Sequence, residues 1–247
     1  IVTLIANGGW TNQMWSGILQ TLQVLDSEAG DWKLQKQARV SFSKNSFSSD
    51  NFCIGNNKTQ VCTSASYAVN TGLAAKGTLR EAPLALLKPF LPESIEFSGT
   101  ANGSYDIRQN NGNPVGTINF KLPKSSFLIK GEDDESRMFT YEDAEINATI
   151  NNRTIKAQAA MKVVNRGDFS SKAILQLSPE NGKHTIEGSA NFDIPNINFA
   201  QELIPRSRGL RGALSSNITF SGLLSKPQIR GQAEIKNGYL RLPEAGT

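Results

Sequence analysis

The chain has little of the material from which most catalytic sites are built. Its 247 residues contain one histidine and two cysteines. A single histidine leaves too little for a Ser-His-Asp triad or a Cys-His pair, and His184 lies in a turn-like stretch that favours a surface position. There is no phosphate-binding glycine loop and no Gly-x-Ser-x-Gly elbow. These absences argue against an enzyme and predict no cofactor and no metal site.

Strong charge and long apolar runs are missing as well. The 26 basic and 22 acidic residues leave a net charge of +4, and no basic run reaches five residues, which argues against nucleic-acid binding. No apolar run approaches the roughly 18 residues that cross a membrane. The acidic run Gly131–Ser136 lacks the ligand spacing of a calcium loop, so we expect a solvated loop. Because the sequence opens within a strand-like pattern, we expect the chain to be part of a longer protein.

The two cysteines flank a turn signal. Cys53 and Cys62 lie on either side of Gly55-Asn56-Asn57, so they can face each other across a hairpin. A disulfide there would contribute about 2–3 kcal/mol in the chain-entropy model and would indicate an oxidising compartment. Two reduced, buried thiols in a cytosolic protein are the alternative.

Most of the chain alternates between apolar and polar residues. Ile118, Phe120 and Leu122 alternate with polar residues, and similar runs follow, separated by Gly, Asn, Asp and Pro. This pattern predicts antiparallel strands joined by short turns, with one apolar and one polar face. A hydrophobic share of 38% is low for a globular chain but sufficient for such a sheet. The three tryptophans, Trp10, Trp15 and Trp32, are predicted to be core anchors.

Two stretches of the chain carry the same markers. The spacing of proline and glycine in residues 92–114 recurs 113 positions later in residues 205–227, so that Gly99 corresponds to Gly212. A short helix-like run precedes each copy, at Pro83–Leu91 and Asn198–Ile204, and is expected to cover an end or edge of the sheet. We therefore predict a tandem β-rich unit in one continuous body. Its approximate sub-units are residues 1–82, 83–194 and 195–247.

Several of these features occur together, and in this order, in one known family. They are Trp15-x-Gly17-x-Leu19, Gly30-Asp31-Trp32-x-Leu34, the paired cysteines, Pro83–Leu91 with Gly99–Pro114, and Gly238–Gly246. Over most of its length the chain resembles a middle part of the TamB family. That family is the inner-membrane-anchored component of the bacterial translocation and assembly module, and it belongs to the AsmA-like and bridge-like lipid transfer proteins.

The resemblance implies an elongated, taco-like β-sheet trough in the periplasm with an apolar concave face. It also implies transport of phospholipids between the inner and outer membranes, contact with their acyl chains, and outer-membrane biogenesis with the partner TamA, which is contacted by regions outside this chain. The resemblance implies no catalytic residues for this chain. The expected lipid-groove residues are Ile95, Phe97, Ile118, Phe120, Leu122, Ile146, Ile150, Leu175, Leu177, Ile186, Phe192, Ile194, Ile218, Phe220, Ile229 and Ile235.

Other interpretations of the same pattern stay open. A closed β-sandwich core would produce the same alternation. A scaffold or chaperone for outer-membrane β-barrel assembly and secretion would instead accept strands at exposed sheet edges. A secreted carbohydrate-acting protein would need paired carboxylates and aromatic platforms, and 8% aromatic residues argue against it.

Overall fold

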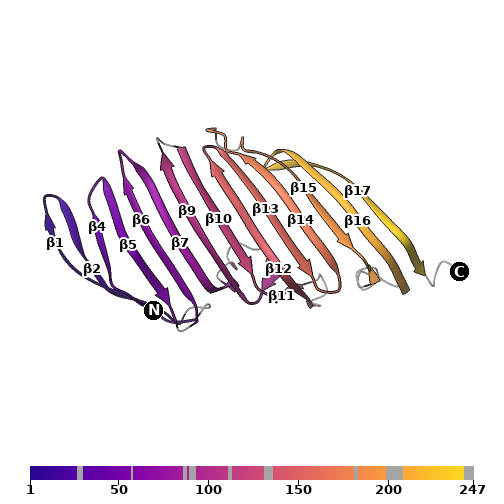
Figure 1. The fold of residues 1–247 in the computed structure, drawn as a ribbon, viewed down its shortest axis with the longest axis horizontal. Helices are drawn as coiled ribbons and strands as arrows, with labels where there is room; N and C mark the ends of the chain where they lie inside the picture. Colours follow the sequence, from indigo (N-terminus) through magenta and orange to yellow (C-terminus); the bar gives the residue numbers. More distant parts are fainter. Residues whose placement is uncertain are drawn as a thin grey trace.

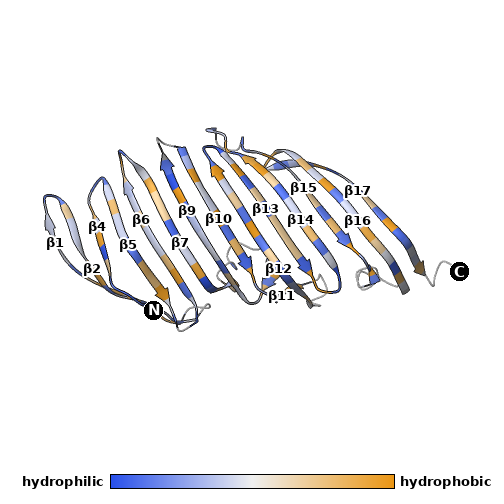
Figure 2. Ribbon diagram, in the orientation of Figure 1, coloured by the Kyte–Doolittle hydropathy of each residue, from blue (hydrophilic) through white to orange (hydrophobic). Residues whose placement is uncertain are grey.

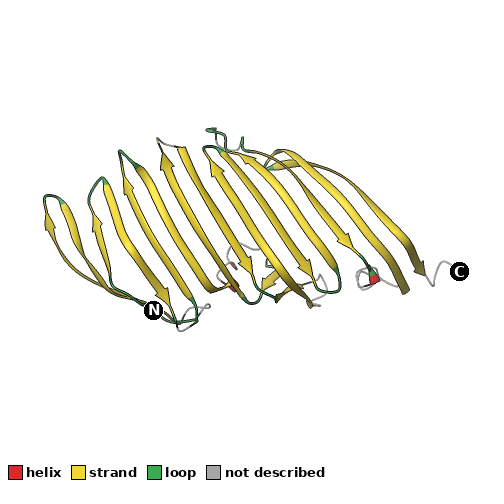
Figure 3. Cartoon of the chain, viewed as in Figure 1, coloured by secondary structure: helices red, strands yellow, loops and turns green. Residues whose placement is uncertain are grey.

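The chain forms one antiparallel sheet (Figure 1). A computed structural model describes residues 1–26, 30–56, 58–85, 88, 93–110, 113–130, 136–180, 183–198 and 208–241. Strands make up 78% of the structure and helix 2% (Figure 3). The strands are β1 (Val2–Thr11), β2 (Met14–Val24), β3 (Trp32–Leu34), β4 (Ala38–Phe42), β5 (Ser46–Gly55), β6 (Gln60–Ala68), β7 (Gly72–Pro83), β8 (Ile95–Phe97), β9 (Thr100–Asn110), β10 (Asn113–Leu122), β11 (Ser125–Lys130), β12 (Ser136–Asn151), β13 (Thr154–Val163), β14 (Gly167–Gln176), β15 (Thr185–Ile194), β16 (Arg208–Leu223) and β17 (Lys226–Arg241). The predicted all-β class is confirmed.

The strands follow one another across the sheet in chain order. Three positions in this meander are filled by broken strands: β3 with β4, β8 with β9, and β10 with β11. In the described part of the chain, β1 pairs with β2 alone and β17 with β16 alone. The sheet is therefore open, with two free edges at its opposite ends (Figure 1).

The two rims of the sheet differ in their connections. Along the upper rim in Figure 1, here called the hairpin rim, tight turns at 12–13, 43–45, 69–71, 152–153 and 224–225 join neighbouring strands. Asn12, Gln13 and Asn152 have positive φ, as the twisted turns of two-residue hairpins require. The opposite rim, the loop rim, carries the connections around Leu84 and Ile197. Asn and Gly also mark a tight turn on the loop rim, at 164–166, where Asn165 has positive φ, so this sequence punctuation predicts turns on both rims.

The predicted repeat relates two equivalent pieces of backbone. The Leu84 amide donates a hydrogen bond to the Gly99 carbonyl, and the Ile197 amide donates one to the Gly212 carbonyl, at 3.0 Å each. Both pairs are related by the 113-residue offset found in the sequence. Gly99 and Gly212 both have positive φ, which a residue with a Cβ adopts only with strain. The chain therefore turns from the loop rim into the sheet in the same way twice.

The predicted start of the first helix-like run, at Pro83, was wrong. Pro83 is not the first residue of a helix but the last residue of β7, where it pairs with Thr100. Its missing amide is tolerated at a strand end. Short 3₁₀ turns occur at Leu84, Ala85 and Asn198. The rest of the two predicted helical runs lies largely outside the described residues, as do Pro92, Gly112, Pro205, and most of the acidic run.

The two cysteines form the predicted disulfide. Cys53 and Cys62 are directly opposite each other on β5 and β6, with their Cα atoms 4.0 Å apart. Their neighbours Ile54 and Val61 form the next cross-strand pair. Because side chains alternate, the disulfide lies on the opposite face of the sheet from Ile54 and Val61.

Several glycines on the apolar face lie directly beneath aromatic rings. Gly188 of β15 pairs with Phe220 of β16, and a Cβ at Gly188 would lie 2.6 Å from the Phe220 ring and would also meet the Lys172 carbonyl oxygen. Gly103 stands in the same relation to Phe120. The rings cover the exposed glycine backbone, an arrangement that rescues glycine positions in sheets.

We expect Gly188→Ala to lower the free energy of unfolding by about 1–3 kcal/mol, because the new methyl group must displace the Phe220 ring or the neighbouring backbone. Chemical denaturation followed by circular dichroism measures this. Gly9→Ala is the control, since a Cβ at Gly9 meets nothing within 4 Å. Equal stabilities of the two variants would refute the proposed packing.

Candidate functional site

The strand register gathers the expected groove residues on one face of the sheet. Phe120 is directly opposite Ile146, Ile150 opposite Gly116, and Gly116 two residues from Ile118. Across the next strands, Leu175 is opposite Ile186, and Phe220 opposite Ile229. Following the pairs strand by strand places every expected residue from β8 to β17 on this same face. Leu177 directly follows β14, and its amide donates a hydrogen bond to the Arg153 carbonyl oxygen at the hairpin rim. We call this surface the apolar face.

The apolar face continues through strands for which no groove residues had been predicted. Val40 pairs with Ser49, Ile54 with Val61, and Leu79 lies opposite Val61 on β7. Figure 2 shows the alternation of apolar and polar residues along strands of both halves of the sheet. The same two-residue period that marked the later strands was present here and could have identified these positions. The face therefore runs from β1 to β17.

Nearly all of the charged residues lie on the other face. Away from the irregular loop-rim ends of β12 and β16, no described Asp, Glu, Lys or Arg stands at a paired position on the apolar face. Lys121 pairs with Glu145, and Lys172 with Ser189, all on the polar face. A surface without ions and with few hydrogen-bonding groups can hold apolar ligands by burial alone.

The apolar face is only partly shielded from water. Its side chains are mostly half-buried, because the sheet curls around them and large neighbours cover one another. At the free edges that cover is lost: Ile229 and Ile235 of β17 are 69% and 57% exposed. An exposed apolar surface that extends across a whole sheet is rare in a protein without a ligand or partner.

A small core closes the loop-rim end of the apolar face. Tyr141 is fully buried there, in a cluster with Leu84, Ala101 and Ala144. The rings of Phe97 and Phe127 lie 6.2 and 6.3 Å from that of Tyr141. The Tyr141 hydroxyl donates a hydrogen bond to the Ser98 carbonyl oxygen over 3.4 Å. Phe97 and Leu122, two of the expected groove residues, therefore pack against a local core.

Burial raises the pKa of Tyr141 above its ordinary value of 10.0. The folded state thus holds the phenol proton more tightly than the unfolded state, and unfolding releases it at alkaline pH. This contribution to stability is fully present below pH 10 and is lost as the pH rises through the folded-state pKa. We expect the wild type to lose more stability than Tyr141→Phe between neutral pH and a pH above 10, measured by urea denaturation. Parallel losses in both proteins would contradict this expectation.

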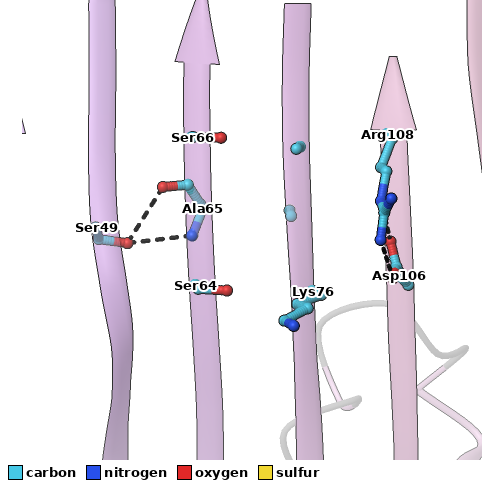
Figure 4. Close-up of a pocket in the computed structure, with 9 residues that line it drawn as sticks. Ser49, Ser64, Ala65, Ser66, Lys76, Asp106 and Arg108 are labelled. Carbon is cyan, nitrogen blue, oxygen red and sulfur yellow. Dashed lines mark hydrogen bonds and ion pairs between the residues drawn. The ribbon is translucent and has the colours of Figure 1, made fainter. Parts of the chain in front are cut away.

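The polar face carries paired charges rather than an assembled reaction centre. Figure 4 shows a shallow hollow lined by Ser64, Ser66 and Lys76, beside Asp106 and Arg108. Arg108 donates two hydrogen bonds of 2.9 Å to the Asp106 carboxylate, which lowers the pKa of Asp106 and raises that of Arg108. The Arg108 and Asp106 side chains of this ion pair are 64% and 41% exposed to solvent.

His184 has a structural contact. Its Nδ1 accepts a hydrogen bond of 3.1 Å from the Ser178 amide, and its carbonyl oxygen accepts one of 2.8 Å from the Leu224 amide. Within the described ranges, no group of three or more His, Cys, Asp and Glu side chains is placed to hold a metal ion.

The tryptophan prediction was correct for one residue and wrong for another. Trp32 is 5% exposed on β3, but Trp10 is 65% exposed on β1. Trp10 lies on the edge strand near the hairpin rim, so it has neighbours on one side only. Aromatic character alone did not distinguish these positions.

A family model, described as TamB, N-terminal domain, matches residues 2–235. The chain belongs to the TamB family. This family is a non-enzymatic transport and assembly module, associated with TamA, and its members are periplasmic and anchored in the inner membrane. No solved structure matches the chain. In the described residues of this TamB-family chain, no helix is long and apolar enough to span a membrane.

Proposed function

We propose that this TamB-family chain is a section of a periplasmic trough that carries phospholipids between the inner and outer membranes. The observation that carries the proposal is the continuous apolar face from β1 to β17, which has no described charged residue at its paired positions away from the loop-rim ends of β12 and β16. Acyl chains need such a path because burying each methylene group stabilises the bound state by about 0.8 kcal/mol. The trough acts without catalysis and without a cofactor, because the lipid changes its location and not its covalent structure.

The opposite faces of the sheet fit this role. The polar face, with charged pairs such as Asp106–Arg108, keeps the outside of the sheet hydrated. The apolar face is continuous along the direction in which the strands follow one another, from β1 to β17. A lipid in this trough would lie across many strands, and movement would exchange one set of equivalent apolar contacts for the next.

A second function would use sheet edges instead of the apolar face. An unpaired edge strand offers backbone amide and carbonyl groups to an incoming strand. The chain could therefore act with TamA as a scaffold for outer-membrane β-barrel assembly and protein secretion. This alternative needs the edges and not the interior of the apolar face.

Mass spectrometry of an organic extract of the purified chain, combined with photocrosslinking from a benzoylphenylalanine at position 120, tests the trough directly. We expect co-purifying phospholipid that crosslinks from position 120. The same probe at Asn119 is the control, because this neighbour points to the polar face. A lipid-free protein, or equal crosslinking from both positions, would remove the trough and favour the scaffold.

A further inference from the structure

A row of aromatic side chains crosses the apolar face at the hairpin rim. The register makes each member the direct cross-strand neighbour of the next, from the edge strand β1 to β6. We call this row the aromatic ladder; its members are Trp10, Trp15, Phe42, Phe47 and Tyr67. Beyond it, Tyr67 faces Leu73 on β7, so the aromatic character ends there.

Three of the ladder rings contact one another, and most of the ladder remains open to water. Trp15 stacks on Phe42 with centroids 5.2 Å apart, and Trp10 meets Phe42 edge-on at 5.7 Å. Phe42, Phe47 and Tyr67 keep between 40% and 43% of their surface exposed. A structural core would bury such rings, as the loop rim of the same region buries Trp32.

The ladder lies where an apolar surface meets water. Below it on the same strands are aliphatic residues such as Leu19 and Val40, and outside it are the polar turns of the hairpin rim. Trp and Tyr favour this kind of boundary in bilayers, where their rings reach the level of the lipid ester groups. We propose that the ladder holds the glycerol–ester region of a phospholipid whose acyl chains lie on the apolar face; this inference rests on the proposed function.

Charge at the hairpin rim complements the phosphate of such a lipid. Exposed Lys44 lies in the turn between the ladder residues Phe42 and Phe47. Arg153 and Lys183 lie in later turns on this rim, and Lys226 is the first residue of β17. The one acidic residue described there is Glu180, which is paired with Lys183. A phosphate at this level would gain charge-assisted hydrogen bonds, and the headgroup would stay in water.

The positions of the tryptophans allow a direct test. The ladder contains Trp10 and Trp15, whereas Trp32 lies at the loop rim. In the Trp32→Phe variant, the only remaining tryptophans are the ladder residues Trp10 and Trp15. In the double variant Trp10→Phe/Trp15→Phe, the only remaining tryptophan is Trp32. Each protein is loaded with phosphatidylcholine brominated either near the ester or near the methyl end of one acyl chain, and bound lipid is quantified by mass spectrometry after vesicles are removed.

We expect ladder fluorescence to be quenched at least twofold more by bromine near the ester than by bromine near the methyl end, with no such preference for Trp32. Bound lipid with equal quenching, or with stronger quenching from the methyl end, would overturn the ladder assignment while leaving the trough intact. Quenching that occurs only while vesicles are present would also overturn it, in favour of docking on a membrane surface. Absence of any bound lipid would overturn the proposed function itself.

A charge variant adds a readout that does not depend on the tryptophans. We expect Lys44→Glu to reduce loading with phosphatidylglycerol several-fold. Lys58→Glu, in a turn at the other end of β5, should leave loading unchanged. Equal effects of the two variants would overturn the headgroup assignment, because they would show only the loss of net positive charge.

Discussion

Phe120→Asp is expected to reduce phospholipid transfer between donor and acceptor vesicles at least tenfold. Phe120 is half-buried at the middle of the apolar face, so the carboxylate remains hydrated while the trough is empty. An acyl chain that passes over this position must remove that water, and an unpaired ion resists dehydration by more than the roughly 1.4 kcal/mol that corresponds to tenfold. The variant should therefore fold and yet fail to conduct.

Matched variants separate this effect from damage to the sheet. Asn119→Asp places the same charge one residue away on the polar face and should transfer lipid at the wild-type rate. Phe120→Leu keeps the face apolar and should also retain transfer. Phe220→Glu repeats the experiment on β16, with Thr219→Glu as its polar-face control.

The two sites together test whether the path is continuous. If the apolar face forms one continuous groove, a single charge at position 120 or 220 blocks transfer. The double variant should then transfer hardly less lipid than either single variant. The amount of bound lipid should instead fall with each added charge, because each charge displaces only the lipid near it. Wild-type transfer in the protein carrying both charges would rule out the trough, whereas additive losses of transfer would indicate separate binding sites.

Much of this face could be predicted because the side-chain period of a strand is two. The period does not survive a β-bulge, however. On β12 the register shifts between Glu142 and Glu145, so that Tyr141 and Ile146 share a face although their numbers differ in parity. A similar shift between Ser49 and Phe52 places Phe47 and Phe52 together. Sequence alternation predicts faces within a strand, and pairing is needed to connect them.

The loop rim was the least predictable part of the chain. Pro83 followed by leucines has the signature of a helix start, but its position at the end of β7 is set by pairing with Thr100 across the sheet. The equivalence of Leu84 and Ile197 was recoverable, because it follows from the spacing of glycine and proline. The burial of Tyr141 was not, since it depends on segments brought together from β8, β9, β11 and β12.

Tyr141→Ala should have the largest effect on stability. Tyr141 is the largest fully buried side chain of the described residues and joins Leu84 to the rings of Phe97 and Phe127. Its truncation leaves a cavity in the core that closes the loop rim, for which we expect a loss of about 3–5 kcal/mol in the free energy of unfolding. Tyr141→Phe removes only the hydroxyl and its long hydrogen bond, and should cost about 0.5–1.5 kcal/mol.

The repeat supplies an internal control for this prediction. In Tyr141→Ala, hydrogen exchange at the Leu84 amide should accelerate strongly, because the segment that donates to Gly99 loses its packing partner. Exchange at the equivalent Ile197 amide should change less, since its contact with Gly212 lies outside the Tyr141 cluster. Acceleration at both amides to the same extent would mean that the sheet opens as one cooperative unit. Unchanged exchange at Leu84 would show that this core does not hold the rim closed.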